Sequence, residues 1–211
     1  MAQMIGTLTA LLTGKLAKEE RNGKPFYTGY FKEMTDYQVW LDVTGLQGDF
    51  QGDTEHHGGV DKAILGYAMK SYRMWEETFG MDLGCGSFGE NLCLSGIDES
   101  MVCIGDIYAI DHVEVEVSQP RQPCWKINHA LENGEMLKNV LATGRTGWYM
   151  RVRKEGYLQR GNMVKLLERP NPDWTILRAN EVMKHKKERK AEVDALLALP
   201  QLADAWKKDL V

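Results

Sequence analysis

The sequence predicts a mainly β fold with helices, in which a largely antiparallel sheet or barrel is followed by a small helical unit. Short runs rich in β-branched and aromatic residues, bounded by turn signals, occupy most of the chain before Pro170. Helical patterns interrupt these runs too rarely for repeated β–α–β units. Pro170 and Pro172 then stop regular structure, and the pattern beyond them is helical. We therefore expect a main domain over residues 1–170 and a three-helix unit over residues 171–211.

The first half of the chain is predicted to hold short strands and one helix. Residues 5–12 and 37–43 are rich in Ile, Leu, Val, Thr, Tyr and Trp, and turn signals such as Asn22-Gly23 bound them. Aromatic residues recur at helical spacing toward the end of the segment 61–79, which predicts a helix there.

Strict alternation of valine and glutamate over residues 113–117 predicts a strand with its valines on a core face and its carboxylates in water. His112 lies on the polar face of this strand, so we expect it to be a solvated surface residue. Two further strands are expected over residues 147–153 and 163–167.

Helices are predicted in two places after Pro123. The first place extends to Gly144, with a break at Asn133-Gly134. The second is the carboxyl-terminal unit, with helices over residues 175–185, 188–198 and 201–208. Helices this short must pack against one another and against the main domain. The basic run over residues 184–190 is interpreted as a solvated helix face rather than a binding patch.

Composition and charge exclude several classes of function. The chain has 211 residues, with 26 Lys plus Arg against 30 Asp plus Glu, a net charge of −4 and a pI near 5.8. This acidic balance argues against a nucleic-acid-binding protein. No apolar run reaches the ~18 residues of a membrane helix. The amino terminus lacks the basic region of a secretion signal, so a cytoplasmic location is expected.

Four cysteines lie at positions 85, 93, 103 and 124, with no Cys-x-x-Cys pair among them. This spacing excludes a zinc ribbon or a thioredoxin-type motif. In a reducing cytoplasm all four thiols are expected to be free. At least three of them are expected to be small buried hydrophobic side chains.

Two glycine-rich segments are candidate ligand-binding loops. Residues 84–89 match the G-x-G-x-x-G pattern of dinucleotide-binding turns, but a helix precedes them and a strand follows, the reverse of what that motif needs. A loop that needs glycine backbone angles explains this segment as well. Residues 45–62 contain His56 and His57 just before a predicted helix, where imidazoles and backbone N–H groups suit an anion. An ordered polar loop is an equally good interpretation of that segment.

The segment 118–126, with the sequence SQPRQPCWK, is the most informative for chemistry. A strand ends before it, and Pro123 stands where a helix should begin, so Cys124 is expected in the first helical turn. The helix dipole and the nearby cations Arg121 and Lys126 favour the thiolate over the thiol form of this cysteine.

Two kinds of chemistry are open to Cys124. It could act as a nucleophile with a histidine partner, for which the candidates are His129, His56 and His57. No protease signature surrounds it, however. A thiolate that ligates a soft metal or carries sulfur is at least as consistent with this setting.

With these motifs in hand, the chain resembles the MOSC domain family, named for the carboxyl-terminal domain of molybdenum cofactor sulfurases. The resemblance rests on four blocks in the right order: GLQGDFQGDTEHHGGVDKA (45–63), FGENL (88–92), SQPRQPCWK (118–126) and GRTGWYMRV (144–152). More narrowly, the chain resembles the bacterial YiiM-like branch, because Arg-Pro at 169–170 and the following helices match a small appended three-helix unit. The resemblance covers nearly the whole chain and implies a MOSC β-barrel-like domain that binds the molybdenum cofactor.

The same resemblance implies roles for individual residues. Cys124 is implied as the catalytic residue and the molybdenum ligand, a third soft ligand beside the two sulfurs of the pterin dithiolene. The phosphate of the cofactor needs a cationic pocket, for which arginine is best suited. The residues expected to bind the cofactor are Arg121, Lys126, His56, His57, Asp61, Lys62, Glu90, Asn91, Gln119, Arg145 and Arg151.

Two functions remain at this point. The resemblance implies a molybdenum-dependent oxidoreductase that reduces N-hydroxylated compounds, such as N-hydroxylated purine base analogues, and so detoxifies them. The alternative is a sulfur or cofactor carrier in which Cys124 holds a persulfide without redox turnover. We favour the reductase.

The reductase interpretation has consequences for cofactors and partners. The sequence has no flavin, haem or iron–sulfur motif, so a separate flavoprotein electron donor is implied. Pyridoxal phosphate is not expected. The expected partners are a small N-hydroxylated substrate and that donor, with a homodimer as the commonest assembly and no nucleic acid or membrane.

Overall fold

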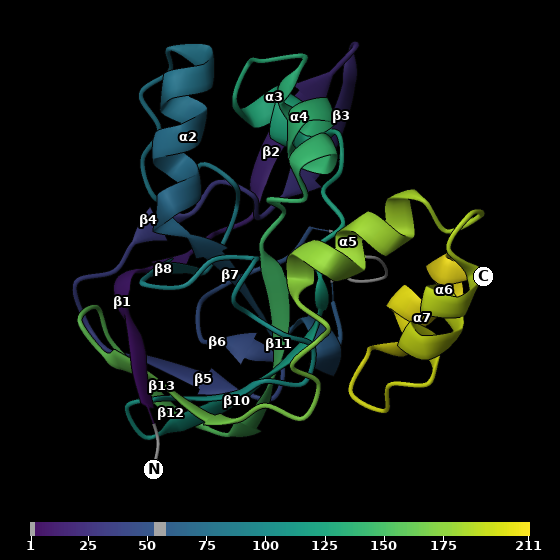
Figure 1. Ribbon diagram of the computed structural model, residues 1–211. Helices are drawn as coiled ribbons and strands as arrows, with labels where there is room; N and C mark the ends of the chain where they lie inside the picture. Colours follow the sequence, from purple (N-terminus) through teal and green to yellow (C-terminus); the bar gives the residue numbers. More distant parts are fainter. Residues whose placement is uncertain (1–2, 53–57) are drawn as a thin grey trace.

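The computed structural model describes residues 3–52 and 58–211 of the chain (Figure 1). In this part of the chain seven strands form a closed barrel in the order β13-β9-β10-β11-β7-β8-β1, and pairing of β1 with β13 closes it. Every neighbouring pair is antiparallel except β7 with β8. The mainly β fold is thereby confirmed. The barrel strands are β1 (Gln3–Thr13), β7 (Ile64–Ala68), β8 (Leu92–Ser95), β9 (Ile107–Ile110), β10 (Val113–Pro120), β11 (Trp148–Lys154) and β13 (Met163–Glu168).

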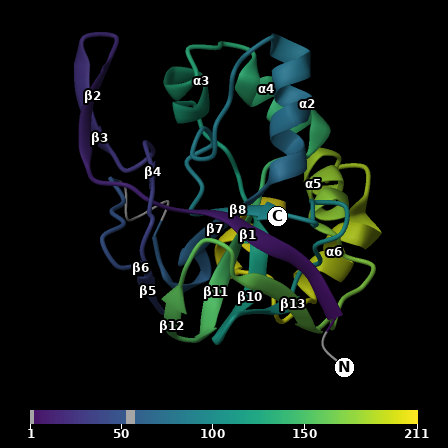
Figure 2. The same ribbon diagram turned by 90° about the vertical axis from the view of Figure 1, so that its left-hand side faces the viewer.

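Six shorter strands lie outside the barrel wall. The hairpin of β2 and β3 projects from the body of the molecule (Figure 2). Its turn is Asn22-Gly23, where both residues have positive φ, as the turn signal predicts. The shorter strands are β2 (Ala17–Arg21), β3 (Lys24–Thr28), β4 (Glu33–Met34), β5 (Val39–Asp42), β6 (Gly45–Leu46) and β12 (Gly156–Leu158).

The α-helices of the described residues fall into two groups. Helices α2, α3 and α4 gather at one end of the barrel, whereas α5, α6 and α7 lie at its side (Figure 1). No helix within residues 3–52 and 58–211 combines the length and the apolar character that a membrane span needs. The helices are α2 (Met69–Phe79), α3 (Lys126–Ala130), α4 (Met136–Thr143), α5 (Ile176–Lys184), α6 (Lys190–Leu197) and α7 (Asp204–Leu210), with a 3-10 turn η1 at Val60–Lys62.

The predicted helix over residues 61–79 is wrong in its first half, where β7 forms a barrel strand. All five residues of β7 are buried, and a short apolar run of this kind fits a strand as well as a helix. Gly66 has a packing role here, because a Cβ atom would lie 3.1 Å from Cε of Met150 on the neighbouring strand.

The three carboxyl-terminal helices pack against the barrel, as their length requires. Buried side chains such as Ile176 and Trp206 join the same apolar cluster as Val115 of the barrel. Backbone hydrogen bonds reinforce this contact, since the N–H of Ile176 donates to the carbonyl of Val102 at 2.8 Å. The division of the chain at residue 170 stays a prediction.

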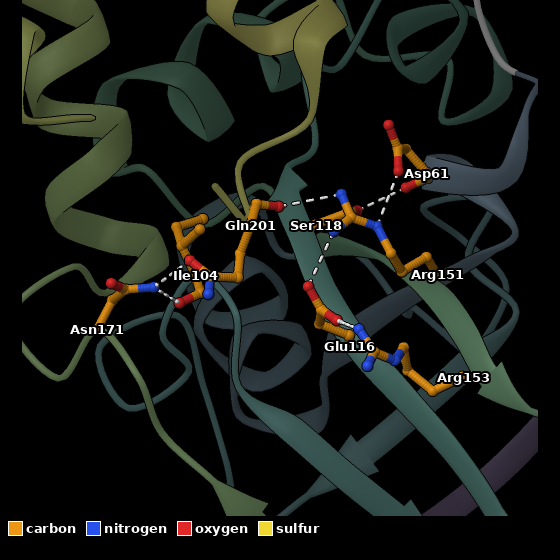
Figure 3. Close-up of polar contacts among 8 residues, drawn as sticks. All are labelled: Asp61, Ile104, Glu116, Ser118, Arg151, Arg153, Asn171 and Gln201. Atoms are coloured by element: carbon orange, nitrogen blue, oxygen red, sulfur yellow. Dashed lines mark hydrogen bonds and ion pairs between the residues drawn. The ribbon is translucent and has the colours of Figure 1, made fainter. Parts of the chain in front are cut away.

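The expectation for the glutamates of β10 is wrong at Glu116. The valines of this strand are buried as predicted, but Glu116 is only 3% exposed. Its carboxylate binds Nη1 of Arg151 at 2.8 Å and Nη1 of Arg153 at 2.6 Å, which offsets the cost of burial (Figure 3). His112 is a solvated surface residue, with its side chain 88% exposed.

The expectation of four free thiols is also wrong. Cys85 and Cys93 form a disulfide, and Cys103 and Cys124 are free. The two bonded residues meet because the segment between them turns back on itself before β8. The expectation of at least three buried cysteines is wrong, because only Cys93 and the free thiol Cys103 are buried, whereas Cys85 and Cys124 are half-buried.

Candidate functional site

A pocket lies where the segment after β3 meets the loop that follows β10. We call it the Cys124 pocket, because this free thiol lies in its wall. Six separate stretches of chain contribute to it, and several of its residues carry charge or an aromatic ring. The lining residues are Thr28, Gly29, Tyr30, Lys32, Asp49, Phe50, Gln51, Gly52, Lys62, Leu65, Gly89, Asn91, Arg121, Gln122, Cys124, Lys126 and Tyr149.

Cys124 stands just before α3 rather than within its first turn, which corrects the prediction. The helix begins at Lys126, and the carbonyl of Cys124 accepts a hydrogen bond from the N–H of Ile127 at 3.2 Å. The helix α3 has only five residues, so its dipole is weak. Aromatic packing holds the start of α3, where Arg21 lies 4.1 Å from the ring centroid of Trp125.

Arg121 is the best-placed cation of the pocket. It is 6% exposed, and its backbone N–H donates to the carbonyl of Gly147 at 3.0 Å. Its guanidinium lies 6.0 Å from the ring centroid of Tyr30, and Nη1 has no partner among the described residues. A buried N–H without an acceptor is costly, so this atom is a ready donor for a bound anion.

The electrostatic environment keeps Arg121 charged and its tyrosine neighbours neutral. Burial acts to lower the pKa of Arg121, but Tyr30, Tyr149 and Cys124 outweigh it and raise that pKa overall. Burial raises the pKa of Tyr30 and of Tyr149 above their usual value, although Arg121 acts in the opposite direction. Both phenols therefore keep their protons at neutral pH and can donate hydrogen bonds.

A second set of charges lines the opposite wall. Nζ of Lys32 forms an ion pair with Oδ1 of Asp49 at 2.5 Å, and both side chains are almost fully buried. Oδ2 of Asp49 also accepts a hydrogen bond from Nδ2 of Asn91 at 2.8 Å. Nζ of Lys62 lies 6.0 Å from the ring centroid of Tyr149. Among the described residues, the pocket is lined by three lysines and one arginine against one carboxylate.

Of the predicted cofactor-binding residues, the structure brings four into the pocket with Cys124: Arg121, Lys126, Lys62 and Asn91. Glu90 lies next to the pocket but does not line it. Its fully buried carboxylate accepts hydrogen bonds from the backbone N–H of Phe88 and from the hydroxyl of Tyr72, so it holds the glycine-rich loop.

The other predicted residues do not line the pocket. The guanidinium of Arg151 is fully engaged, because it binds Asp61 and Glu116 and donates from Nη2 to the carbonyl of Gln201 at 3.0 Å (Figure 3). Gln119 is buried on β10, and Arg145 is half-buried beside α4. His56 and His57 lie outside the described residues.

Sequence reasoning missed Tyr30, Lys32, Asp49 and Tyr149. Asp49 lies in the glycine-rich segment that was singled out, so its polarity was a usable signal. Nothing local marks the other three, because their contacts join residues far apart in the chain.

The donor set fits a ligand that combines a soft metal with an anionic group. Cys124 offers a sulfur ligand, and the unpartnered Nη1 of Arg121 offers a buried donor to an anion. Within residues 3–52 and 58–211, no group of three or more His, Cys, Asp or Glu could hold a metal ion by itself. A metal bound here would therefore depend on ligands from a cofactor as well as on the protein.

Comparison with known proteins agrees with this architecture. Residues 53–165 match the model of the MOSC domain, and residues 174–210 match the model of the YiiM-like, 3-alpha helix domain. Protein YflK of Bacillus subtilis is 36% identical over 98% of this chain and 94% of its own length. A protein of Gibberella moniliformis named "Reductase" is 37% identical over 85% of this chain, which spans only 32% of that longer protein.

Solved structures give the same assignment. The crystal structure of YiiM from Geobacillus stearothermophilus has a TM-score of 0.82 and 28% identity over 97% of both chains. Protein YiiM of Escherichia coli is 30% identical over 94% of this chain and 88% of its own length, and its crystal structure has a TM-score of 0.79. These matches show that the chain belongs to the MOSC domain family, in its YiiM-like branch.

Proposed function

We propose that this protein binds the molybdenum cofactor in the Cys124 pocket, with Cys124 as the metal ligand, and reduces N-hydroxylated compounds. The observation that carries the proposal is that one pocket holds a free thiol and the buried guanidinium of Arg121, whose Nη1 has no partner among the described residues. MOSC domains are associated in general with molybdenum cofactor binding, and the name of the fungal relative supports a reductive reaction.

The residues of the pocket have different roles in binding. The Cys124 thiolate supplies a soft ligand, and Arg121 with Lys126 and Lys62 neutralises an anionic group such as a phosphate. The neutral phenol of Tyr149 carries a proton in the pocket wall, so it can donate a hydrogen bond to a polar substrate, whereas the hydroxyl of Tyr30 already donates to the carbonyl of Ser87.

The reaction reduces an N–OH bond. Two electrons and two protons convert R–NH–OH to R–NH₂ and water, so the N–O bond breaks and the oxygen leaves as water. When bound, the molybdenum centre supplies chemistry that delivers an electron pair and accepts oxygen. A separate flavoprotein reductase, oxidising a reduced nicotinamide, supplies the electrons.

An assay of wild type and two cysteine variants tests this function. Holo-protein with a flavoprotein reductase and reduced nicotinamide is mixed with an N-hydroxylated purine base, and the amine product is quantified. Wild type and Cys103→Ser should form the amine, whereas Cys124→Ser should not, because a hydroxyl is a poor ligand for a soft metal. The molybdenum content of each preparation is measured alongside.

The sulfur-carrier alternative makes a different prediction on the same samples. It requires a mass increase of about one sulfur atom on Cys124 that a reductant removes. A persulfide on this residue without any amine formed by the molybdenum-loaded protein would overturn the reductase proposal.

A further inference from the structure

The disulfide between Cys85 and Cys93 closes a segment that forms part of the Cys124 pocket. Gly89 and Asn91 lie between the two cysteines and line the pocket. Cys93 is fully buried on β8, whereas Cys85 is half-buried in the preceding loop. A small reagent therefore meets the sulfur of Cys85 first.

A buried carboxylate connects the disulfide to its own loop. Oε1 of Glu90 lies 3.3 Å from Sγ of Cys93, and Oε2 accepts a hydrogen bond from the N–H of Phe88 at 3.2 Å. The hydroxyl of Tyr72 binds the same carboxylate and lies 3.6 Å from Sγ of Cys93. The carboxylate that shapes the loop therefore lies directly against the sulfur of Cys93.

The loop in turn holds the tyrosine whose ring faces Arg121. The hydroxyl of Tyr30 donates to the carbonyl of Ser87 at 3.2 Å. Gly89 packs so closely on the ring of Tyr30 that a Cβ atom would lie 3.0 Å from Cδ2. The guanidinium of Arg121 lies 6.0 Å from the ring centroid of Tyr30, so the path from disulfide to pocket cation passes through one loop and one side chain.

We propose that Cys85 and Cys93 form a reversible thiol–disulfide exchange site for low-molecular-weight thiols, and that its state sets the position of Tyr30 and Arg121 in the Cys124 pocket. This goes beyond the proposed reductase function. In a reducing compartment, a protein disulfide is typically transient and redox-sensing.

The exchange needs no reactant other than the protein disulfide and two molecules of a small thiol. A thiolate attacks Sγ of Cys85, the bond between the protein sulfurs breaks, and Cys93 leaves and takes up a proton. A second thiol then attacks the mixed disulfide, so that the protein disulfide and two thiols give the protein dithiol and a disulfide of the small thiol.

Reduction must displace the loop. Bonded sulfurs lie about 2 Å apart, whereas non-bonded heavy atoms need roughly 3.5–4.0 Å. Cys93 is held in the barrel wall by β8, so the displacement falls on Cys85 and the glycine-rich loop that Tyr30 touches.

The test uses full-length protein from cells that do not make molybdopterin, so that Cys124 carries no cofactor. The protein is equilibrated in buffers of reduced and oxidised dithiothreitol, its free thiols are alkylated with N-ethylmaleimide, and the mass of the intact chain is measured by mass spectrometry. The oxidised form should carry two fewer maleimide adducts than the reduced form. The same exchange is repeated with glutathione, the probe for a physiological thiol.

The pocket is then probed by the rate at which iodoacetamide alkylates Cys124 in each form. We expect a roughly threefold to tenfold difference, since displacement of Tyr30 and Arg121 changes the access of the reagent to the sulfur of Cys124. The Cys85→Ser/Cys93→Ala double variant should lose this dependence on redox state, and Cys103→Ser should keep it. If the double variant fails to fold, the two forms of the wild type still give the comparison.

The proposal is overturned if the pair stays reduced in oxidised buffer, or stays bonded in reduced buffer. It is equally overturned if the pair converts while the alkylation rate of Cys124 stays the same. Neither readout needs the cofactor, so a failure of the reductase assay would not affect them.

Discussion

Glu99 is a buried carboxyl group whose ionisation should make folding depend on pH. Burial raises its pKa to about 7, although the backbone N–H of Gly147 and the charge of Arg145 act to lower it. Oε1 accepts the N–H of Gly147 at 3.0 Å, and Oε2 has no partner among the described residues. The carbonyl of Gly147 accepts the N–H of Arg121, so this carboxyl lies two hydrogen bonds from the Cys124 pocket.

The size of the effect follows from the two pKa values. The ordinary pKa of a glutamate, 4.5, applies to the unfolded chain, against about 7 in the folded protein. Between these values the folded state holds a proton that the unfolded state has lost, so the free energy of unfolding falls as the pH rises. At about 1.4 kcal/mol for each pKa unit, the total loss is about 3 kcal/mol, complete above pH 7.

The Glu99→Gln variant should lack this loss. Urea unfolding of wild type and variant at several pH values from 5 to 8 gives the difference in free energy of unfolding. As the pH rises across this range, the free energy of unfolding of the variant should increase relative to that of the wild type by roughly 2 to 3 kcal/mol. The exposed Glu20 provides the control, since Glu20→Gln should follow the wild type at every pH. A parallel pH dependence of wild type and Glu99→Gln would refute the reasoning.

Two further predictions concern the junction between the barrel and the three-helix unit. Arg151→Gln should lower the free energy of unfolding in urea by about 2 kcal/mol, because it leaves Asp61 and Glu116 without their shared cation. Arg153→Gln should cost less than about 1 kcal/mol, because this half-exposed residue binds Glu116 alone; equal losses would contradict the assignment. Removal of residues 173–211 should destabilise the barrel, because the apolar faces of these helices pack on it. The isolated peptide 173–211 should show no cooperative thermal transition by circular dichroism. A cooperative transition of the peptide would contradict the dependence of its helices on the barrel.

The sequence predicted the elements whose signal is local. The turn at Asn22-Gly23 and the three carboxyl-terminal helices lie where composition and periodicity indicate them. The pattern failed at β7, because a short apolar run directly before a helix fits a strand as well as the first turns of that helix. It failed at Glu116 for another reason, since only the fold shows that two arginines of β11 stand opposite that residue.

The candidate site was predictable where its residues share one short segment. Cys124 and Arg121 belong to the same loop, and both line the pocket. The ion pair between Lys32 and Asp49 and the disulfide of Cys85 depend on how the chain folds back, and spacing alone does not indicate them. The sequence likewise does not show that the guanidinium of Arg151 is occupied by three partners, because Asp61, Glu116 and Gln201 come together only in the fold.

The most direct test of the central claim is the molybdenum and pterin content of protein purified from cells that synthesise molybdopterin. Wild type should carry about one molybdenum per chain, and X-ray absorption should detect one more sulfur ligand than in Cys124→Ser. Arg121→Ala should fold normally and retain less cofactor, whereas Arg153→Ala should retain as much as wild type. Full molybdenum with an unchanged sulfur count in Cys124→Ser, or no molybdenum in the wild type, would contradict the account.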